Sequence, residues 1–320
     1  TTFALMLLFQ QGSLNLDQTL HSAIPDFSGT SKKDVTIRQL LSHAAGLPDY
    51  RPYYKTLTKH PSSERKSILR EFLLDEALIH EPGRASLYSD VGFMILEWLI
   101  EVTAKKSLDR FVEESVYEPL RLKDLFFVPF TPTQTLPLEG GGQGVGKGRE
   151  VHPYAATEDC PWRGKILDGE VHDENAYALG GVAGHAGLFG TAQDVYGLLK
   201  EILNVYAGKP NRGLFRRDLV QTFFQRQTGS GSWALGFDTP AHPNSSSGRY
   251  FSDQSIGHLG FTGTSFWVDL QKAVVVILLT NRIHPTRQNE KIRDFRPLLH
   301  DAIMDTILIK SGISFPNLSL

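Results

Sequence analysis

The chain of 320 residues has little cysteine, almost no net charge and no long hydrophobic run. Its one cysteine, Cys160, cannot form an internal disulfide, which excludes a disulfide framework without identifying a compartment. Lysine and arginine number 33 against 35 aspartates and glutamates, for a net charge of −2. A chain so balanced has no electrostatic basis for binding nucleic acid or an anionic membrane surface.

The longest apolar runs, residues 3–9 and 273–279, fall far short of the ~20 residues that a membrane-spanning helix needs. We therefore expect no membrane span. With 41% hydrophobic residues, the chain can still bury a large core, so a disordered protein is excluded.

Two hydrolase signatures are also missing, namely Gly-x-Ser-x-Gly of the α/β-hydrolases and His-Glu-x-x-His of zinc peptidases. The glycines of residues 139–150 suggest a phosphate-binding loop, but Gly148 stands where that motif needs Ser or Thr. We predict a mobile loop there instead. A metal centre would have to be assembled from scattered positions, such as His172 with Asp173 and Glu174, and His185.

Hydrophobic periodicity predicts helices in the first 220 residues and mainly strands after residue 230. Thr36, Asp90, Ser107 and Thr191 are expected to cap helices. The predicted helices cover residues 1–11, 37–43, 61–78, 91–104, 107–117, 192–206 and 290–309, and the predicted strands cover residues 125–130, 233–237, 260–269 and 273–281.

Three passages combine polar side chains with glycine in a distinctive order. The first, residues 36–48, reads Thr-Ile-Arg-Gln-Leu-Leu-Ser-His-Ala-Ala-Gly-Leu-Pro, the second is Tyr88-Ser89-Asp90, and the third is His258-Leu259-Gly260. In this order and at these separations they resemble the serine β-lactamase and penicillin-binding-protein superfamily. The resemblance is to its class C-like branch, which includes esterases and D-amino-acid peptidases.

The resemblance implies an α/β (α+β) fold of the β-lactamase and transpeptidase type. In that fold an antiparallel sheet flanked by helices lies beside a mainly helical layer, and the reaction cleft lies between them. We expect a single domain over residues 1–320, with the helical layer at about residues 40–220 and the sheet and C-terminal helix at about residues 230–312.

The resemblance also implies a nucleophilic Ser-x-x-Lys at the start of a helix that continues like Thr1 to Gly12. We therefore expect the chain to begin just after this motif, with the family's N-terminal strands missing. The sequence contains one Ser-x-x-Lys, Ser63 to Lys66, but it follows the Thr36 passage and lies in a highly charged segment. We do not expect Ser63 to be catalytic.

By its match to the family's Tyr-x-Asn motif, Tyr88 would share a proton with the lysine of that Ser-x-x-Lys. A phenol titrates near pH 10 in water, so it needs nearby cations to act as a base. Asp90 would bind the same lysine or a substrate amide, or would only cap the helix that follows.

His258 stands where the family has the lysine of Lys-Thr-Gly. A histidine is only partly charged near neutrality, which favours esters or amides without an obligatory carboxylate. Gly260 would permit close approach of a ligand, and the Phe261 N–H would bind the oxyanion. His185 is expected either to line the substrate pocket or to belong to a structural glycine turn.

The implied activity is hydrolysis through an acyl-enzyme, on an ester, a peptide or a β-lactam, with no metal or organic cofactor. The expected partner is a small-molecule or peptide substrate. The resemblance is compatible with a location in the cell envelope or periplasm. Two alternatives remain: an inactive fragment or binding remnant of this fold, and a metal-dependent hydrolase.

Overall fold

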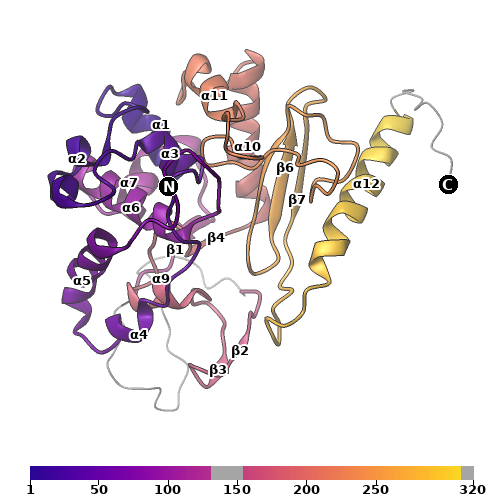
Figure 1. Ribbon diagram of the computed structural model, residues 1–320. Helices are drawn as coiled ribbons and strands as arrows, with labels where there is room; N and C mark the ends of the chain where they lie inside the picture. The colour runs from indigo at the N-terminus through magenta and orange to yellow at the C-terminus, as the bar shows by residue number, and fades with distance from the viewer. Residues whose placement is uncertain (131–153, 311–320) are drawn as a thin grey trace.

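The computed structural model describes residues 1–130 and 154–310, so the glycine-rich loop predicted at residues 139–150 lies outside the described residues. The first part of the chain is mainly helical, and a small antiparallel sheet with a long C-terminal helix follows (Figure 1). This mixture of helices and antiparallel strands confirms the expected fold class. The helices are α1 Thr2–Gln10, α2 Leu20–Ala23, α3 Ile37–Leu41, α4 Tyr54–Leu57, α5 Ser62–Asp75, α6 Asp90–Ala104, α7 Leu108–Val112, α8 Glu118–Leu120, α9 Glu174–Ala178, α10 Ala192–Ala207, α11 Arg217–Phe224 and α12 Ile292–Lys310, with short helical turns η1 Pro25–Gly29 and η2 Glu113–Tyr117.

The described strands form three antiparallel sheets. Strands β5 Ile256–Leu259, β6 Ser265–Asp269 and β7 Val274–Leu278 follow one another in the largest. Alternation along them directs Trp267 and Val276 toward Met304 of α12, while Phe266 and Ile277 pack against the main core. Each face of this sheet is therefore covered. The two-stranded sheets pair β1 Leu125–Phe127 with β4 Leu188–Gly190, and β2 Asp159–Cys160 with β3 Lys165–Ile166.

Helix α6 crosses the main core, and most of its residues are buried. Its N-cap is Ser89, whose hydroxyl accepts a hydrogen bond from the Gly92 N–H at 3.0 Å. The prediction of Asp90 as the cap is therefore wrong by one residue, and Asp90 lies in the first helical turn with its carboxylate available to other groups. The caps predicted at Thr36 and Thr191 are confirmed, because each side chain accepts a backbone hydrogen bond from its own helix.

Several predicted elements are shorter than expected or absent. Residues 233–237 form no strand, because Gly236 turns the chain with a φ of 76° and donates its N–H to the Leu41 carbonyl. The strand predicted from residue 260 begins at Ser265, after a turn at Gly263. The segment after Ser107 divides into α7, η2 and α8, and the Ser107 side chain makes no capping bond.

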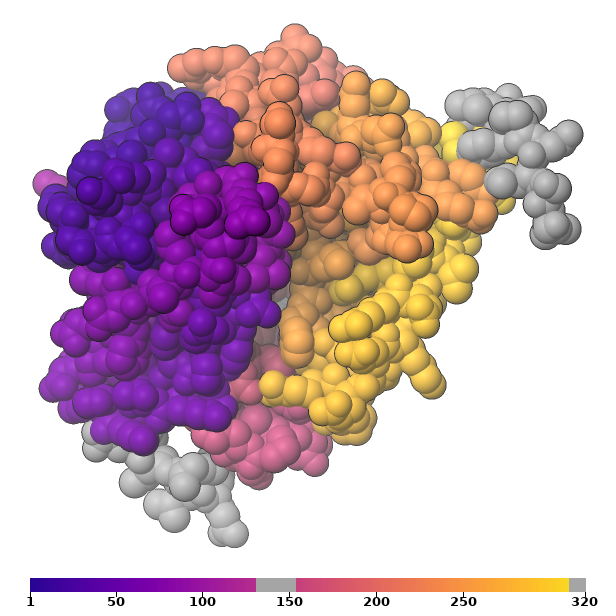
Figure 2. All heavy atoms as spheres, in the orientation of Figure 1, coloured from indigo at the N-terminus to yellow at the C-terminus, as the bar shows by residue number. Residues whose placement is uncertain are grey.

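The space-filling view shows a groove between the early helices, coloured indigo and purple, and the late strands and α12, coloured orange and yellow (Figure 2). Within the described ranges, none of the helices is both long enough and apolar enough to span a bilayer.

Candidate active site

Four aromatic side chains from separate parts of the chain converge beside β5. Tyr88, in the loop before α6, and His258, in β5, have ring centroids 6.1 Å apart. The Trp233 ring lies 5.8 Å from each of these two rings. His43, from the turn after α3, lies 4.4 Å from Trp233 and 4.7 Å from Tyr88. The fold thus brings two predicted site residues together and adds two that the sequence did not indicate.

His43 is a buried, neutral imidazole at the base of this group. The Ser89 N–H donates to its Nδ1 at 3.1 Å, so Nδ1 carries the lone pair. Burial, and after it the neighbouring His258, lowers the pKa of His43 to about 3. His43 therefore fixes the backbone next to Tyr88 without adding charge.

His258 is half-buried on β5 and is also neutral near pH 7. Its Nδ1 lies 3.0 Å from the Leu259 carbonyl oxygen, and since a carbonyl can only accept, Nδ1 carries the proton. Burial lowers the pKa of the ring, and the bond to Leu259 only partly opposes this. The Nε2 lone pair of His258 is therefore a hydrogen-bond acceptor, where a lysine would place a fixed positive charge.

Tyr88 and Asp90 form a hydrogen-bonded pair at the entrance to α6. Burial of the phenol, the Asp90 charge and the hydrogen bond to Asp90 together raise the pKa of Tyr88 well above its usual range. Burial likewise raises the pKa of Asp90, a shift that His185 opposes and Asp173 reinforces. Although the phenol group is buried, 39% of the Tyr88 residue surface remains exposed, so part of this side chain is accessible to a ligand.

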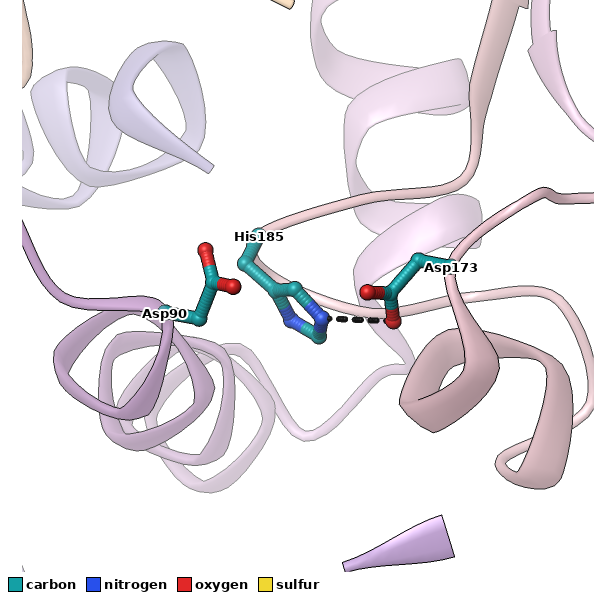
Figure 3. Close-up of side chains that lie close together, drawn as sticks. All are labelled: Asp90, Asp173 and His185. Carbon is teal, nitrogen blue, oxygen red and sulfur yellow. Dashed lines mark hydrogen bonds and ion pairs between the residues drawn. The ribbon is translucent and has the colours of Figure 1, made fainter. Parts of the chain in front are cut away.

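His185 lies between two carboxylates, Asp90 on one side and Asp173 on the other (Figure 3). Its Nε2 is 2.9 Å from Asp173, and its side chain is only 1% exposed, so it lies beneath the surface and does not line an open pocket. Burial disfavours the charged ring, but the carboxylates of Asp173, Asp90 and Glu97 outweigh it and raise the pKa of His185 to about 9. At neutral pH the ring is a cation.

Asp90, Asp173 and His185 are also the group in the described part of the chain whose donor atoms could converge on a metal ion, since they lie within 4.8 Å of one another. The Nε2 of His185 is, however, already bonded to Asp173. The raised pKa of His185 favours the protonated ring, so a metal ion would also have to displace a proton. The arrangement fits a buried cation between two anions better than a set of metal ligands.

The other residues considered for a metal centre belong to an ion network. His172 bonds to Glu158 at 3.1 Å, and the Arg287 guanidinium bonds to Glu158 and to Glu174. A guanidinium between two carboxylates occupies the position that a metal would need. His172 and His185 therefore lie in two different clusters.

Gly260 and Phe261 follow the last residue of β5. A Cβ on Gly260 would lie 2.1 Å from the Thr264 hydroxyl, so glycine is required here by the turn itself and not by a ligand alone. The Phe261 side chain is 59% exposed and stacks on His172 at 5.7 Å. Among the described residues, none accepts a hydrogen bond from the Phe261 N–H.

Ser63 lies apart from these groups. It is exposed near the start of α5, and Lys66 is bound by Glu97 at 3.0 Å and by Glu101 at 2.5 Å. The two carboxylates hold the pKa of Lys66 above its usual range against the effect of burial, so this lysine cannot serve as a base for Ser63.

Comparison with known proteins gives a family match over nearly the whole chain. The family model described as "Beta-lactamase" matches residues 1–300. A curated protein of Salmonella agona (strain SL483), named "Putative D-alanyl-D-alanine carboxypeptidase", is 33% identical over 309 residues, which cover 91% of this chain and 69% of that protein. Its Salmonella typhi counterpart matches with the same identity and coverage.

Solved structures share the fold at lower identity. EstCE1, described as a hydrolase with promiscuous acyltransferase activity, has a TM-score of 0.61 at 22% identity, with 92% of this chain and 81% of that chain covered. A penicillin-binding protein from Bacillus halodurans also has a TM-score of 0.61, at 17% identity, with 93% and 82% covered.

Proposed function

The chain belongs to the beta-lactamase family. On that premise, we propose that its function is that of a serine hydrolase, which acts through an acyl-enzyme on an ester or amide. The observation that carries the proposal is the convergence of Tyr88, paired with Asp90, on His258 beside β5. The proposal takes the nucleophile from a Ser-x-x-Lys motif beside the start of α1, as the family resemblance implies.

Each site residue then has a defined role. The serine oxygen bonds to the substrate carbonyl carbon. The serine proton passes through the lysine and Tyr88 to the leaving group, as the bond between the carbonyl carbon and the leaving group breaks. The Phe261 N–H binds the oxyanion, together with the serine's own N–H. Water then attacks the acyl-enzyme, which releases the acid and restores the serine. Asp90 orients the Tyr88 hydroxyl throughout.

The proposed substrate lacks an obligatory carboxylate. His258 is neutral near pH 7 because burial lowers its pKa, so it offers an acceptor at Nε2 in place of a fixed cation. The exposed aromatic surfaces of Tyr88 and Phe261 add apolar contact area beside it. These features favour an uncharged group next to the scissile bond.

A second candidate is a D-alanyl-D-alanine carboxypeptidase, which the name of the relative at 33% identity favours. Such a substrate ends in a carboxylate, which needs a donor or a cation in the site. The two candidates therefore differ in whether activity depends on that negative charge.

The proposal is tested on these 320 residues and, in parallel, on a form extended upstream in its gene. Each is incubated with a fluorophosphonate and with a penicillin, and the intact mass is measured. Hydrolysis of p-nitrophenyl butyrate and of a peptide ending in D-alanyl-D-alanine is then compared. Ser63→Ala is the control variant, because Ser63 is exposed and has no part in the proposed site.

Two results together support the proposal. The extended form carries an adduct on the serine of a Ser-x-x-Lys motif just before α1, and it hydrolyses the ester faster than the peptide. Faster release of D-alanine favours the carboxypeptidase. An adduct that Ser63→Ala abolishes contradicts the assigned site. Activity that a chelator removes and serine reagents leave intact would show a metal-dependent hydrolase, and no reaction in either form would show an inactive binding remnant.

A further inference from the structure

A chain of four polar side chains leads from the interior of the molecule to the Tyr88 hydroxyl. Asp173, just before α9, bonds to His185 in the glycine-rich loop after α9. His185 faces Asp90 at the start of α6 (Figure 3). Asp90 in turn interacts with Tyr88. We propose that His185, held by Asp173, is a positioning residue that keeps Asp90 ionised and so holds the Tyr88 hydroxyl in place. This inference rests on the proposed function, because it concerns the same site.

The geometry places the His185 ring between two carboxylates, Asp173 and Asp90. Nε2 is 2.9 Å from Asp173, and the second ring nitrogen, Nδ1, faces the side of Asp90. That nitrogen is buried and has no hydrogen-bond partner among the described residues. The donor atoms of the three side chains lie within 4.8 Å of one another.

Without the cation, the two carboxylates would repel each other in a poorly hydrated site. Carboxylates at such a separation do not both ionise easily, and one of them takes up a proton. A protonated Asp90 would then compete as a donor with the Tyr88 hydroxyl and would lose its preference for accepting from it. The charge on His185 therefore determines which way the Tyr88 hydrogen bond points.

Helix α6 also fixes the loop that carries His185. The Gly184 N–H donates to the buried Glu97 carboxylate at 2.8 Å. A Cβ on Gly184 would lie 2.1 Å from the Phe93 carbonyl oxygen, so only glycine lets the loop pack directly on the helix. The same helix thus supplies Asp90 and the contacts that set the position of His185 relative to it.

Several other charged groups face this chain and contribute to any pH dependence. Glu97 acts on His185, Asp49 on Asp90, and His172 on Asp173. The test must therefore follow His185 itself and not only a bulk pH profile.

The first test is nitrogen-15 NMR of the histidine rings of the 320-residue chain between pH 5 and pH 10. We expect the His185 ring to remain doubly protonated at pH 7.5 and to lose its proton near pH 9. Asp173→Asn should lower that midpoint by at least one pH unit. A neutral His185 at pH 7.5, or an unchanged midpoint in Asp173→Asn, would overturn the proposal. This readout needs no activity, so it stands apart from the proposed function.

The second test measures the rate of acylation by p-nitrophenyl butyrate. It uses whichever form reacts with this ester, the 320-residue chain or the form extended upstream. We expect His185→Gln to lower the rate at pH 7.5 at least tenfold, and Asp173→Asn to move the alkaline limb of the profile to lower pH. The control is His242→Gln, which breaks an exposed His–Asp pair of the same 2.9 Å length and should leave the rate unchanged. An unmoved alkaline limb in Asp173→Asn overturns the positioning role. A wild type that is never acylated refutes the proposed function instead.

Titration calorimetry with zinc and manganese chlorides separates the cation from a metal centre. We expect that neither metal binds at micromolar concentration to a site that depends on His185, so wild type and His185→Gln should give the same titration. Micromolar binding that is lost in His185→Gln and in Asp90→Asn would overturn the proposal in favour of a metal site.

Discussion

At the residue scale, the proposed proton chemistry is divided between a protonated phenol and a neutral histidine. Tyr88 has a raised pKa because of burial and Asp90, while His258 has a lowered pKa because of burial. A proton that reaches the site can therefore leave through the phenol, and the Nε2 of His258 can accept a hydrogen bond from the substrate or from water. The two residues are not interchangeable.

Substitution separates these two roles. Tyr88→Phe removes the hydroxyl and keeps the ring, so we expect acylation to slow by about 100-fold, as for loss of a general acid–base group. His258→Ala should change the ratio of ester to peptide hydrolysis by about tenfold and slow acylation less, because it removes an acceptor beside the substrate. Stopped-flow acylation with both substrates measures each effect. Equally small effects of both substitutions would contradict the assignment.

Residue identities could be predicted only where a motif carries them. Tyr88 and His258 stand in recognisable short patterns, and the structure places them together. His43 and Trp233 lie in the same group of rings, yet they are 190 positions apart and carry no shared pattern, so only the folded chain brings them into contact. The pairing of Asp173 with His185 likewise depends on how tightly the glycine loop folds back on α9.

At the element scale, the glycine-rich loop after α9 and helix α6 act as one unit. Gly181 and Gly187 have φ angles of 91° and 106°, and a Cβ on either would lie 2.3 Å from a backbone oxygen. The loop is thus tightly folded, and it has little room to shift away from the helix. Its position controls the distance between His185 and Asp90.

Gly184→Ala tests this coupling. The added methyl would meet the Phe93 carbonyl at 2.1 Å and the Glu97 side chain at 2.9 Å, so we expect a loss of roughly 3 kcal/mol in unfolding free energy. Urea unfolding at pH 7 measures it. The control is Gly29→Ala, whose new methyl meets no atom within 4 Å and should change stability by less than about 1 kcal/mol. Equal effects of the two substitutions would refute the close packing of loop on helix.

Element boundaries were predictable where a side chain caps the backbone. Thr36 and Thr191 each accept a hydrogen bond from their own helix, and both helices begin where the sequence indicates. The strand predicted at residues 233–237 fails because Gly236 adopts a turn that an alternating pattern does not reveal. Asp90 was misplaced because Ser89 and Asp90 are both good caps, and only the observed hydrogen bond distinguishes them.

At the scale of the whole molecule, the expectation of a helical part beside an antiparallel sheet came from the order and spacing of three motifs. Local periodicity alone could not have placed β5 opposite the Tyr88 loop, because the two lie about 170 residues apart and meet only through the packing of the sheet on the main core. The same packing buries two histidines in opposite charge states, His43 neutral and His185 charged. Their titration should therefore govern how stability depends on pH.

His43 and His185 are expected to limit stability on opposite sides of neutrality. The folded pKa of His43 is lowered to about 3, so the stability that it contributes is present above about pH 6.5 and declines as the pH falls toward 3. The folded pKa of His185 is raised to about 9, so its contribution is present below about pH 6.5 and declines as the pH rises through 9. Each decline should be at most about 1.4 kcal/mol per pH unit.

Urea unfolding of the wild type and of two variants at pH 4.5, 6.5 and 9.5 checks this. We expect His185→Gln to be less stable at pH 6.5 and to lose little more at pH 9.5, since the group that titrates there is gone. His43→Asn should lose the decline at pH 4.5 and keep the decline at pH 9.5. If His185→Gln retained the full alkaline decline, another group would be titrating, and the buried cation between Asp90 and Asp173 would have to be abandoned.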